Sequence, residues 1–493
     1  MKKRLLVFTV LMCFLFTGAA GRIGFVIFSG NYQVSSKHNS YTVDIDKIYE
    51  TVYDRNLSRI TNKTTGLIAV IRPTEKCITE LNRLFSYKER EEIVEELKQG
   101  YPVIREIDHY VHCRYIKIFE TTSRHSDDMI AGHIVSSCER LKPELVGSKS
   151  INFSVDAIGR LLDGDDGEIL GENYNTKRGI MLTLDSSIQK AAEKAAESID
   201  SGAVVVLDTE TSEVLAAYSK PNDYLNRAFS SYCVGSVYKL VVAACALENG
   251  VNDSYECEGK VTVGDTTFAC QRDTKHGKQT MKDALANSCN CYFIELALKL
   301  GADKIIETSE KFGFGEKNAL YDGWSVTNGN LPDADFLKSK GQLALLGFGQ
   351  GSLTDSPLHF ASVIAAIANK GMYKAPQIVM GDVSDNGTVT HRAGNSSHRA
   401  ISEKTAKTLC EYMRYVVTDG SGRRADYNHE SAGKTSTAQS GIMNGDKEIF
   451  YTWFAGFYPY SNPKYSIVVM TEDGVSGAVD GGPVFRSIVE NIG

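Results

Sequence analysis

The amino-acid sequence predicts that residues 181–493 form an α+β fold, in which helices pack on an antiparallel sheet. Strand-like segments occur at both ends of this region, over residues 203–218 and 431–471, and helical segments lie between them. The last two strand-like runs, 452–458 and 464–471, are joined by only five residues. That connection is too short for a crossover helix, so these strands run antiparallel. Strands from both ends with helices between them are typical of the α+β class.

Hydrophobic periodicity places the elements of this region in order along the chain. Short apolar runs bounded by turn residues predict strands, and apolar residues that recur every three to four positions predict helices. In chain order we expect a strand at 181–185, a helix at 186–198, hairpin arms at 203–207 and 214–218, a helix that begins near residue 236, helices at 281–300 and 354–370, and strands at 431–439, 452–458 and 464–471.

Residues 29–180 are predicted to form a separate mixed domain. Residues 44–53 and 65–71 include strand-like runs, and residues 75–99 have the periodicity of a charge-rich helix that ends at Gly100. This part of the sequence contains no catalytic constellation, and its charged helix is typical of a solvated surface. We therefore expect a spacer or docking domain.

Residues 1–28 are predicted to form a cytoplasmic tip and a membrane anchor. Three basic residues precede an apolar run over residues 5–20, which covers about 24 Å as a helix, less than the roughly 30 Å of a bilayer core. The run continues over residues 23–28, beyond Arg22, whose long side chain can reach the interface. Basic residues before the helix keep the N-terminus in the cytoplasm, so the rest of the chain is expected outside the cell membrane after a single pass. The alternative is a secreted form cleaved after Gly18-Ala19-Ala20.

Composition argues against several classes of function. The net charge of −7 and the absence of a basic cluster argue against a nucleic-acid partner. The eleven cysteines are scattered without zinc-type CxxC pairs, and His276 and the other nine histidines show no metal-ligand spacing. We therefore expect no metal and no cofactor.

Ser236 is the first candidate catalytic residue. Gly235 precedes it, Lys239 follows three residues later, and the apolar run 240–247 predicts a buried helix. Residues three apart share one helical face, so the Lys239 amine is expected near the Ser236 hydroxyl. A serine becomes a good nucleophile when a neighbouring base takes its proton, and a lysine can be that base if burial or a second cation lowers its pKa. The apolar helix offers the burial, and Lys434 can supply the cation.

Two further stretches carry side chains suited to the same chemistry. Ser288-Cys289-Asn290 lies in a break between helical segments, where side chains can project into a cleft. Lys434-Thr435-Ser436-Thr437 belongs to a strand of small, hydroxyl-bearing and cationic residues, which is unusual for an edge strand. Ser384-Asp385-Asn386 also has the Ser-x-Asn form. However, Gly387 follows it between two valine-containing runs, so we interpret this stretch as a structural hairpin turn.

The sequence resembles the class B penicillin-binding proteins in three motifs, which occur in the same order. They are a serine with a lysine three residues later, a Ser-x-Asn and a strand that begins with Lys-Thr and a small residue. The resemblance covers residues 181–493 and is supported by flanking stretches. These are Asn226-Arg227-Ala228-Phe229, Cys257 and Cys270 ahead of His276-Gly277, Gly349-Gln350-Gly351 with Thr354, Trp453-Phe454-Ala455-Gly456-Phe457 and Pro483-Val484-Phe485. The resemblance implies the penicillin-binding transpeptidase fold in a short, transpeptidase-only protein. Residues 29–180 would then be the family's pedestal domain.

The resemblance also implies an activity, that of a serine D,D-transpeptidase that crosslinks peptidoglycan stem peptides ending in D-Ala-D-Ala and that β-lactams inhibit covalently. Ser236 would attack the penultimate D-alanine carbonyl while Lys239 takes its proton. Ser288 would relay a proton toward the leaving group, and Asn290 would orient Lys239 and the substrate amide.

The strand motif would bind the substrate. Lys434 with Thr435 and Thr437 would hold the terminal carboxylate, and the backbone N–H groups of Ser236 and Thr437 would form the oxyanion hole. Ser436 belongs to the same substrate-binding stretch, at a position where the family usually has glycine. The family further implies a partner, a membrane-embedded glycan polymerase that supplies uncrosslinked strands.

Two other functions use the same motifs. A D,D-carboxypeptidase or β-lactam-hydrolysing relative would transfer the acyl group to water. A catalytically weak scaffold or β-lactam sensor is favoured by the departures from the family pattern at Ser436 and at Cys233-Val234, where an acidic-Pro pair is usual.

The sequence leaves two interpretations open for Cys289 and two for Ser436. Cys289 could pair with Cys270 in a disulfide that displaces Ser288 and Asn290, or it could be a small buried residue. The Ser436 side chain could wedge the strand away from the serine-bearing helix, which would slow acylation, or its hydroxyl could form a useful hydrogen bond.

Overall fold

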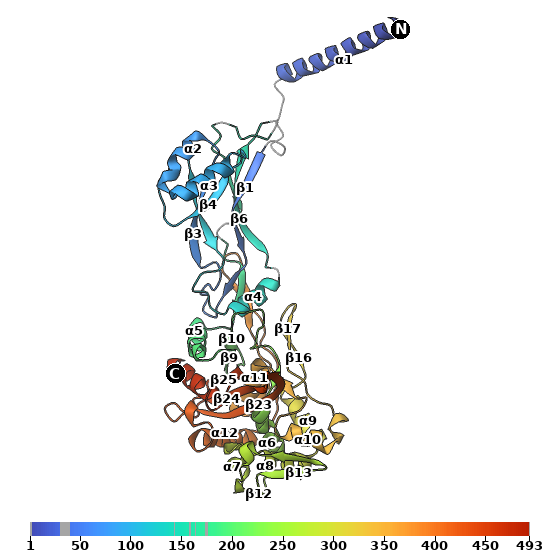
Figure 1. The fold of residues 1–493 in the computed structure, drawn as a ribbon, viewed down its shortest axis with the longest axis vertical. Coiled ribbons are helices and arrows are strands. Elements are labelled where there is room, and N and C mark those ends of the chain that lie inside the picture. The colour runs from blue at the N-terminus through green and yellow to red at the C-terminus, as the bar shows by residue number, and fades with distance from the viewer. Residues whose placement is uncertain are drawn as a thin grey trace. The chain divides into compact units, whose positions relative to one another are not determined.

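The computed structural model describes residues 2–29, 40–141, 143–156, 159–162, 164–172 and 176–492 (Figure 1). The chain forms two compact units. The first unit comprises Met1–Ile48, Thr65–Thr122 and Gly147–Tyr174, and the second, here called the C-terminal unit, comprises Tyr49–Thr64, Ser123–Val146 and Asn175–Gly493. The division differs from the expected boundary at residue 180, because three segments of the expected docking domain, 49–64, 123–146 and 175–180, belong to the C-terminal unit. One reason is the short strand β2 (Thr51–Tyr53), which pairs in parallel with β8 (Gly179–Leu182).

The first unit contains the N-terminal helix α1 (Lys2–Ser29) and two three-stranded sheets. The 20 residues Leu6–Phe25 have a mean hydropathy of 1.9, so this helix is long and apolar enough to cross a membrane. The sheets have the orders β1-β6-β7 and β4-β3-β5. Their strands are β1 (Ser40–Tyr49), β3 (Thr64–Ile71), β4 (Val103–Ile107), β5 (Lys117–Ser123), β6 (Leu145–Ser154) and β7 (Glu168–Glu172).

The expectation of a single helix over residues 75–99 was wrong. The segment forms two helices, α2 (Glu75–Glu80) and α3 (Tyr87–Leu97). Ser86 starts the second helix as its N-cap, in a capping box with Glu89 that satisfies backbone N–H groups at this end. The spacing of Ser86 and Glu89 is the sequence signal that marks this new start.

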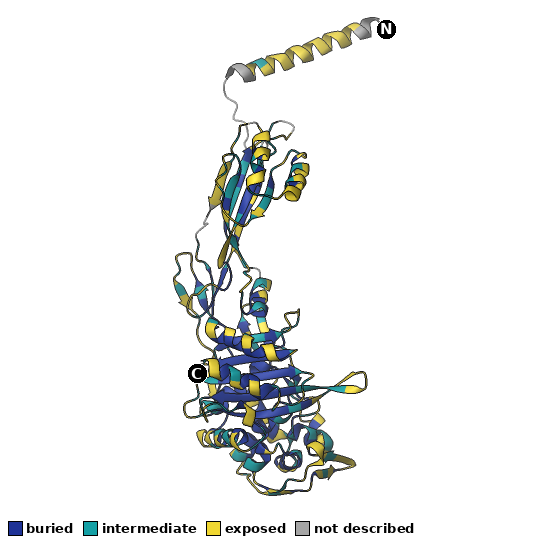
Figure 2. Ribbon diagram, turned by 60° about the vertical axis from the view of Figure 1, so that its left-hand side comes forward, coloured by how far each residue is buried: buried dark blue, intermediate teal, exposed yellow. Residues whose placement is uncertain are grey.

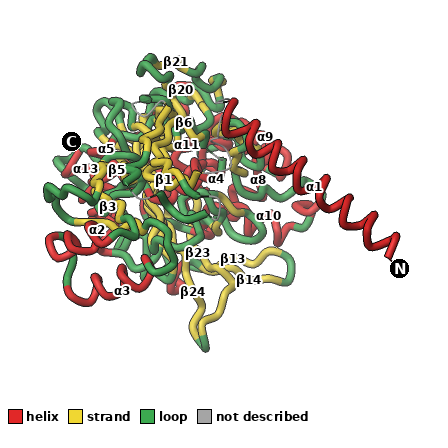
Figure 3. The backbone as a smooth tube through the Cα atoms, turned by 90° about the horizontal axis from the view of Figure 1, so that it is seen from above, coloured by secondary structure: helices red, strands yellow, loops and turns green. Residues whose placement is uncertain are grey.

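The C-terminal unit is built on a five-stranded antiparallel sheet with the order β10-β9-β25-β24-β23. The α+β prediction is confirmed, and so is the antiparallel pairing of the last two strands. The strands are β9 (Gly202–Asp208), β10 (Val214–Lys220), β23 (Ala432–Asn444), β24 (Lys447–Tyr458) and β25 (Tyr465–Glu472). At the far end of their ladder, β23 and β24 continue as an exposed two-stranded ribbon (Figure 3).

Helices cover both faces of this sheet. Helix α11 (Pro357–Ala368) packs against β9, β24 and β25, whereas α5 (Ser186–Ala195) and α13 (Gly481–Ile492) pack on the other side. Along β9, alternate residues belong to different cores, so every side chain of Ala203 to Leu207 is buried. In Figure 2 the strands of the central sheet are accordingly mostly dark blue. The apolar run therefore predicted a central strand correctly.

The remaining elements of the C-terminal unit surround this sheet. The helices are α4 (Gly132–Arg140), α6 (Lys239–Glu248), α7 (Met281–Ala286), α8 (Asn290–Leu300), α9 (Ala302–Lys311), α10 (Lys340–Gly347) and α12 (Glu403–Thr418). The short strands are β11 (Tyr232–Cys233), β12 (Tyr255–Cys257), β13 (Lys260–Val263), β14 (Thr266–Ala269), β15 (Gly277–Gln279), β16 (Lys317–Tyr321), β17 (Trp324–Thr327), β18 (Thr354–Asp355), β19 (Met372–Lys374), β20 (Val379–Val383), β21 (Val389–His391) and β22 (Ser397–Arg399).

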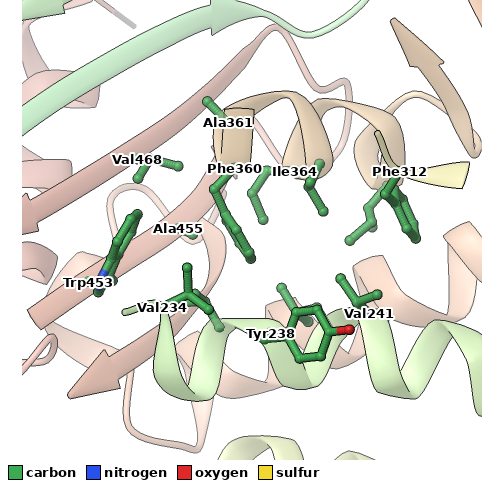
Figure 4. Close-up of a cluster of buried hydrophobic side chains, with 14 of the residues drawn as sticks. Val234, Tyr238, Val241, Phe312, Phe360, Ala361, Ile364, Trp453, Ala455 and Val468 are labelled. Atoms are coloured by element: carbon green, nitrogen blue, oxygen red, sulfur yellow. The ribbon is translucent and has the colours of Figure 1, made fainter. Parts of the chain in front are cut away.

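A buried apolar layer fixes the segment that carries Ser236. In Figure 4, Phe360 and Ile364 of α11 face Tyr238 and Val241, and all four side chains are fully buried. Residues of the sheet close the layer: Trp453, Ala455 and Val468. Because closely packed cores resist displacement, the backbone at Ser236 is held on a rigid base.

Ser384-Asp385-Asn386 forms the hairpin turn that the sequence predicts. It connects the antiparallel strands β20 and β21, and the Asn386 side chain accepts a hydrogen bond from the Thr388 N–H. Gly387 has a φ of +87°, the left-handed conformation that a glycine adopts without strain.

Candidate active site

Ser236 lies in a 3₁₀ turn, Gly235–Tyr238, that leads directly into α6. In a 3₁₀ turn, side chains three residues apart are eclipsed, so Ser236 and Lys239 lie on one face as predicted. Gly235 has a φ of +56°. The turn therefore needs a glycine at this position, directly before the serine.

The backbone that leads into Ser236 is held by three hydrogen bonds from distant parts of the chain. The Trp453 indole N–H donates to the Cys233 carbonyl at 3.0 Å, and the Ser436 hydroxyl donates to the Val234 carbonyl at 2.7 Å. The Gly235 N–H donates to the Gly349 carbonyl at 2.9 Å. These bonds fix the position of the serine independently of its own side chain.

Lys239 is fully buried beneath the cleft. Its amine donates to the Ser288 carbonyl oxygen at 2.8 Å and to Asn290 Oδ1 at 2.7 Å. Burial lowers the pKa of Lys239 to about 8, and nearby thiol groups, first among them Cys289, partly oppose this shift. The third contact of this amine is with Ser288 Oγ at 3.4 Å. A neutral amine has two N–H groups and one lone pair, so with both N–H groups engaged by the two closer oxygens its lone pair faces the Ser288 hydroxyl.

Lys434 is also fully buried, and its amine donates to Ser288 Oγ at 3.0 Å and to the Thr435 carbonyl at 2.8 Å. Burial, and then the charge of Lys239, lower the pKa of Lys434 well below its usual value. Repulsion between two ammonium groups acts on both, so Lys434 is the second cation that the sequence suggested beside Lys239, and burial of Lys239 acts in the same direction.

Ser288 lies between the two lysines, in the connection from α7 to α8. Its Oγ is 3.4 Å from the Lys239 amine and 3.0 Å from the Lys434 amine. Ser288 has a φ of +53°, an uncommon conformation for a residue with a side chain. Such strain persists where the surrounding structure enforces it, and it is concentrated at functional sites.

These groups border a cleft of about 610 Å³. Six of the residues predicted from the sequence line it: Ser236, Ser288, Asn290, Thr435, Ser436 and Thr437. The two buried lysines lie behind these residues and reach the cleft through Ser288. All eight predicted site residues are thus brought together.

The structure adds Ser421 and Gln439 to the cleft lining. The Ser421 hydroxyl is 2.6 Å from the Thr435 hydroxyl, so it orients a side chain of the strand motif. Ser421 follows α12 in a short loop without any motif, and no sequence signal identified it. Gln439 lies on β23 two residues after Thr437, and the alternation of that strand could have identified it.

Ser436 does not act as a wedge in this structure. Its hydroxyl donates to the Val234 carbonyl, and a Cβ at Gly235 would lie 2.5 Å from Ser436 Oγ. The space for the serine side chain is therefore provided by the glycine opposite it. The second interpretation, a useful hydrogen bond, accounts for these contacts.

We expect Ser436→Gly to lower the rate of penicillin acylation by about two- to tenfold, because the buried Val234 carbonyl loses its donor next to the nucleophile. The measurement is the second-order acylation rate constant of the variant against the unaltered protein. Ser384→Gly, in the exposed hairpin turn, is the matched control and should leave the rate unchanged. A clear rise for Ser436→Gly would restore the wedge interpretation.

Comparison with known protein families gives one clear match. The family model described as the penicillin-binding protein transpeptidase domain matches residues 202–490, more than half of the chain. Stage V sporulation protein D of Bacillus subtilis is 29% identical over 382 residues, which cover 71% of this chain and 58% of the relative. Penicillin-binding protein PbpB of Mycolicibacterium smegmatis is 31% identical over 366 residues, covering 65% of this chain and 55% of the relative. The chain thus spans little more than half the length of these curated relatives.

One further relative is covered over more of its own length, and two solved structures are similar in fold. Peptidoglycan D,D-transpeptidase PbpA of Mycobacterium tuberculosis is 24% identical over 70% of this chain and 81% of its own. The crystal structure of penicillin-binding protein 3 from M. tuberculosis with aztreonam superimposes with a TM-score of 0.62 at 21% identity, covering 92% of this chain and 96% of that chain. The ceftriaxone acyl-enzyme of penicillin-binding protein A from M. tuberculosis gives a TM-score of 0.57 at 22% identity, covering 64% and 80% of the two chains. The two structural matches show a shared fold.

Proposed function

The chain belongs to the penicillin-binding protein transpeptidase family, and from that premise we propose that it is a serine D,D-transpeptidase of peptidoglycan synthesis. The observation that carries the proposal is the position of Ser288 Oγ between two buried lysine amines, at a cleft that Ser236 also lines. Relatives named as peptidoglycan D,D-transpeptidases, and family structures with bound β-lactams, support the same conclusion.

Acylation begins when the Lys239 amine accepts the proton of the Ser236 hydroxyl. Ser236 Oγ then attacks the carbonyl carbon of the penultimate D-alanine, and the negative charge that develops on the carbonyl oxygen is stabilised by the N–H groups of Ser236 and Thr437. Lys239 returns the proton through Ser288 Oγ to the amine of the departing D-alanine. An amine from a neighbouring stem peptide releases the acyl group by the reverse proton path, which forms the crosslink.

The strand motif recognises the carboxylate of the substrate. Burial lowers the pKa of Lys434 well below its usual value. A carboxylate bound next to the Lys434 amine would act in the opposite direction and favour its ammonium form. Thr435 and Thr437 supply hydroxyl donors to the same carboxylate, and Ser421 orients that of Thr435. A β-lactam carries a carboxylate in a comparable position and is bound in the same way.

An acyl-transfer assay tests this function. The purified chain is given a D-Ala-D-Ala thioester analogue together with a D-amino acid acceptor, and the acyl-enzyme, the hydrolysed product and the transferred product are quantified. We expect transfer to exceed hydrolysis, because crosslinking requires the acyl-enzyme to be protected from water. Predominant hydrolysis would identify a carboxypeptidase or a β-lactam-hydrolysing relative, and acylation without turnover would identify a sensor or scaffold.

The N-terminal part of the chain is proposed to anchor and dock the enzyme. Helix α1 would span the cell membrane once with its N-terminus in the cytoplasm, which leaves the catalytic unit outside, where peptidoglycan is assembled. A membrane-embedded glycan polymerase is the proposed partner, because crosslinking requires newly made strands close to the active site. Among the described residues before 181, none lines the cleft, and this part of the chain would provide the contact.

Replacing residues 1–28 with a cleavable secretion signal should preserve penicillin labelling but abolish copurification with the polymerase. The reason is that a contact within the membrane is lost with the helix while the catalytic unit stays folded. The measurement is affinity purification from detergent-solubilised membranes, with the full chain as the control. Full retention of the polymerase by the secreted form would exclude a role of the anchor in this contact.

A further inference from the structure

Three cysteines and a histidine converge beside the active site: Cys257, Cys270, His276 and Cys289. Their ligand atoms all lie within 4.8 Å of one another, and the three thiols are buried. The residues come from the end of β12, from the residue after β14, from the residue before β15 and from the N-cap of α8. The four residues do not have metal-ligand spacing in the sequence, because only folding brings their segments together.

Three separations within this cluster match those of neighbouring ligands around one metal ion, and the others are within 4.8 Å. Cys257 Sγ is 3.7 Å from Cys270 Sγ and 3.5 Å from His276 Nδ1, and Cys270 Sγ is 3.7 Å from Cys289 Sγ. Around a tetrahedral zinc ion with Zn–S bonds of about 2.3 Å and Zn–N bonds of about 2.05 Å, neighbouring ligands lie about 3.8 Å (S to S) and 3.6 Å (S to N) apart. A disulfide would need sulfur atoms only about 2.05 Å apart.

Backbone N–H groups point at two of the sulfur atoms. The Gly259 N–H donates to Cys257 Sγ at 3.4 Å, and the Tyr292 N–H donates to Cys289 Sγ at 3.5 Å. Such hydrogen bonds stabilise a thiolate and fix its direction, as the groups that surround metal ligands do. The cluster therefore has four candidate ligands and also the hydrogen bonds that orient ligand atoms in metal sites.

The region between Cys257 and His276 has few elements of its own to stabilise it. It consists of two isolated two-stranded pairings, β12 with β15 and β13 with β14, joined through Arg272 and Asp273 in left-handed conformations, with φ of 57° and 54°. Two-stranded sheets of this length are marginally stable by themselves in water. Small segments with little core of their own are commonly stabilised by a structural metal.

We propose that Cys257, Cys270, His276 and Cys289 bind a zinc ion, and that this ion holds the Ser288–Asn290 stretch in its catalytic position. Thiolate ligands with one imidazole select zinc over magnesium or calcium, and a set of four protein ligands is typical of a structural site. Cys289 is flanked by the two residues that bind the Lys239 amine, so a zinc–sulfur bond there fixes both. The second part of this proposal rests on the proposed function, whereas the first does not.

Metal analysis of the full chain, purified in detergent with its thiols reduced, tests the first part. We expect one zinc ion per chain, retained after dialysis, and a thiolate-to-cobalt absorption band when cobalt replaces zinc. Cys257→Ser and His276→Ala should lower the zinc content to the background level. Cys291→Ser is the matched control, since Cys291 Sγ lies 3.5 Å from Cys270 Sγ but outside the four-ligand set, and it should retain the ion.

Several outcomes would overturn the zinc site. These are a reduced chain that neither contains nor takes up zinc, zinc that persists in both ligand variants, and a Cys270–Cys289 disulfide found in non-reduced peptides of the active protein. Because the cobalt band is measured on the unaltered chain, misfolding of a variant does not affect the conclusion.

The second part is tested by removing zinc with a chelator and measuring the penicillin acylation rate. We expect the rate to fall by about tenfold or more, since small displacements of catalytic groups have effects of this size, and to recover when zinc is added back. An unchanged rate in zinc-free protein would show that the ion has no influence on the active site. The unaltered, zinc-loaded protein must be acylated in the same assay, so a failure of the proposed function is recognised separately.

Discussion

Ser236→Ala is expected to abolish covalent penicillin labelling, with the acylation rate reduced by at least about a thousandfold. In the proposed mechanism the Ser236 hydroxyl oxygen is the atom that forms the acyl-enzyme bond. The fold should be unaffected, because the turn is held by the Trp453, Ser436 and Gly349 contacts and not by the Ser236 side chain. Labelling is measured with a fluorescent penicillin after denaturing electrophoresis, and folding by the thermal unfolding temperature.

Ser384→Ala is the matched control for this experiment. Ser384 begins the second Ser-x-Asn-like sequence, but it lies exposed in the turn between β20 and β21, where its hydroxyl donates to Asn386 Oδ1. The variant should be labelled at the normal rate. Persistent labelling of Ser236→Ala would remove the basis of the proposed mechanism.

Lys239→Met should reduce acylation about as severely as loss of Ser236, because the nucleophile and its base act as one unit. Methionine fills a similar volume without a basic nitrogen, so the buried position remains occupied. Lys239→Ala is a second variant with the same expected loss, and the two together separate chemistry from packing. If either variant keeps more than about a tenth of the normal acylation rate, Lys239 is not the base.

The pH dependence of acylation in the unaltered protein reports on the same group. Only the neutral amine can accept the serine proton, and the pKa of Lys239 is lowered to about 8. The rate should therefore rise about tenfold per pH unit below pH 8 and level off above it. A lysine with an ordinary pKa would continue to gain rate up to about pH 10, and a rate independent of pH between 6 and 9 would exclude a titrating base.

Much of the fold and the site was predictable from local sequence patterns. The Ser236–Lys239 spacing, the apolar helix after it and the alternating strands each depend on residues that are close in the chain, and their periodicity fixes which face they share. The order of the motifs then indicated which segments come together. For this reason the sequence could indicate which residues lie together at the cleft, whereas their roles stay predictions.

Features that depend on distant segments were not predictable. The division into units follows the pairing of β2 with β8, which are more than a hundred residues apart. The cysteine–histidine cluster combines four elements with no characteristic spacing, and the hydrogen bond from Ser436 exists only because Gly235 leaves room for it. The start of α3 at Ser86 was missed although Ser86 and Glu89 have the spacing of a capping box, which is a local signal.

The two buried lysines also affect the stability of the protein. Each amine is held away from water, so the folded state binds its proton less readily than the unfolded chain, in which a lysine has a pKa near 10.4. For Lys239 the destabilisation is absent above about pH 10.5, grows as the pH falls, and is constant below about pH 8, where it reaches about 3 kcal/mol. The C-terminal unit therefore folds with less stability at neutral pH than the same scaffold with apolar residues at these positions. A lysine at such a buried position can serve as a catalytic base, whereas an apolar side chain at the same position would make the fold more stable.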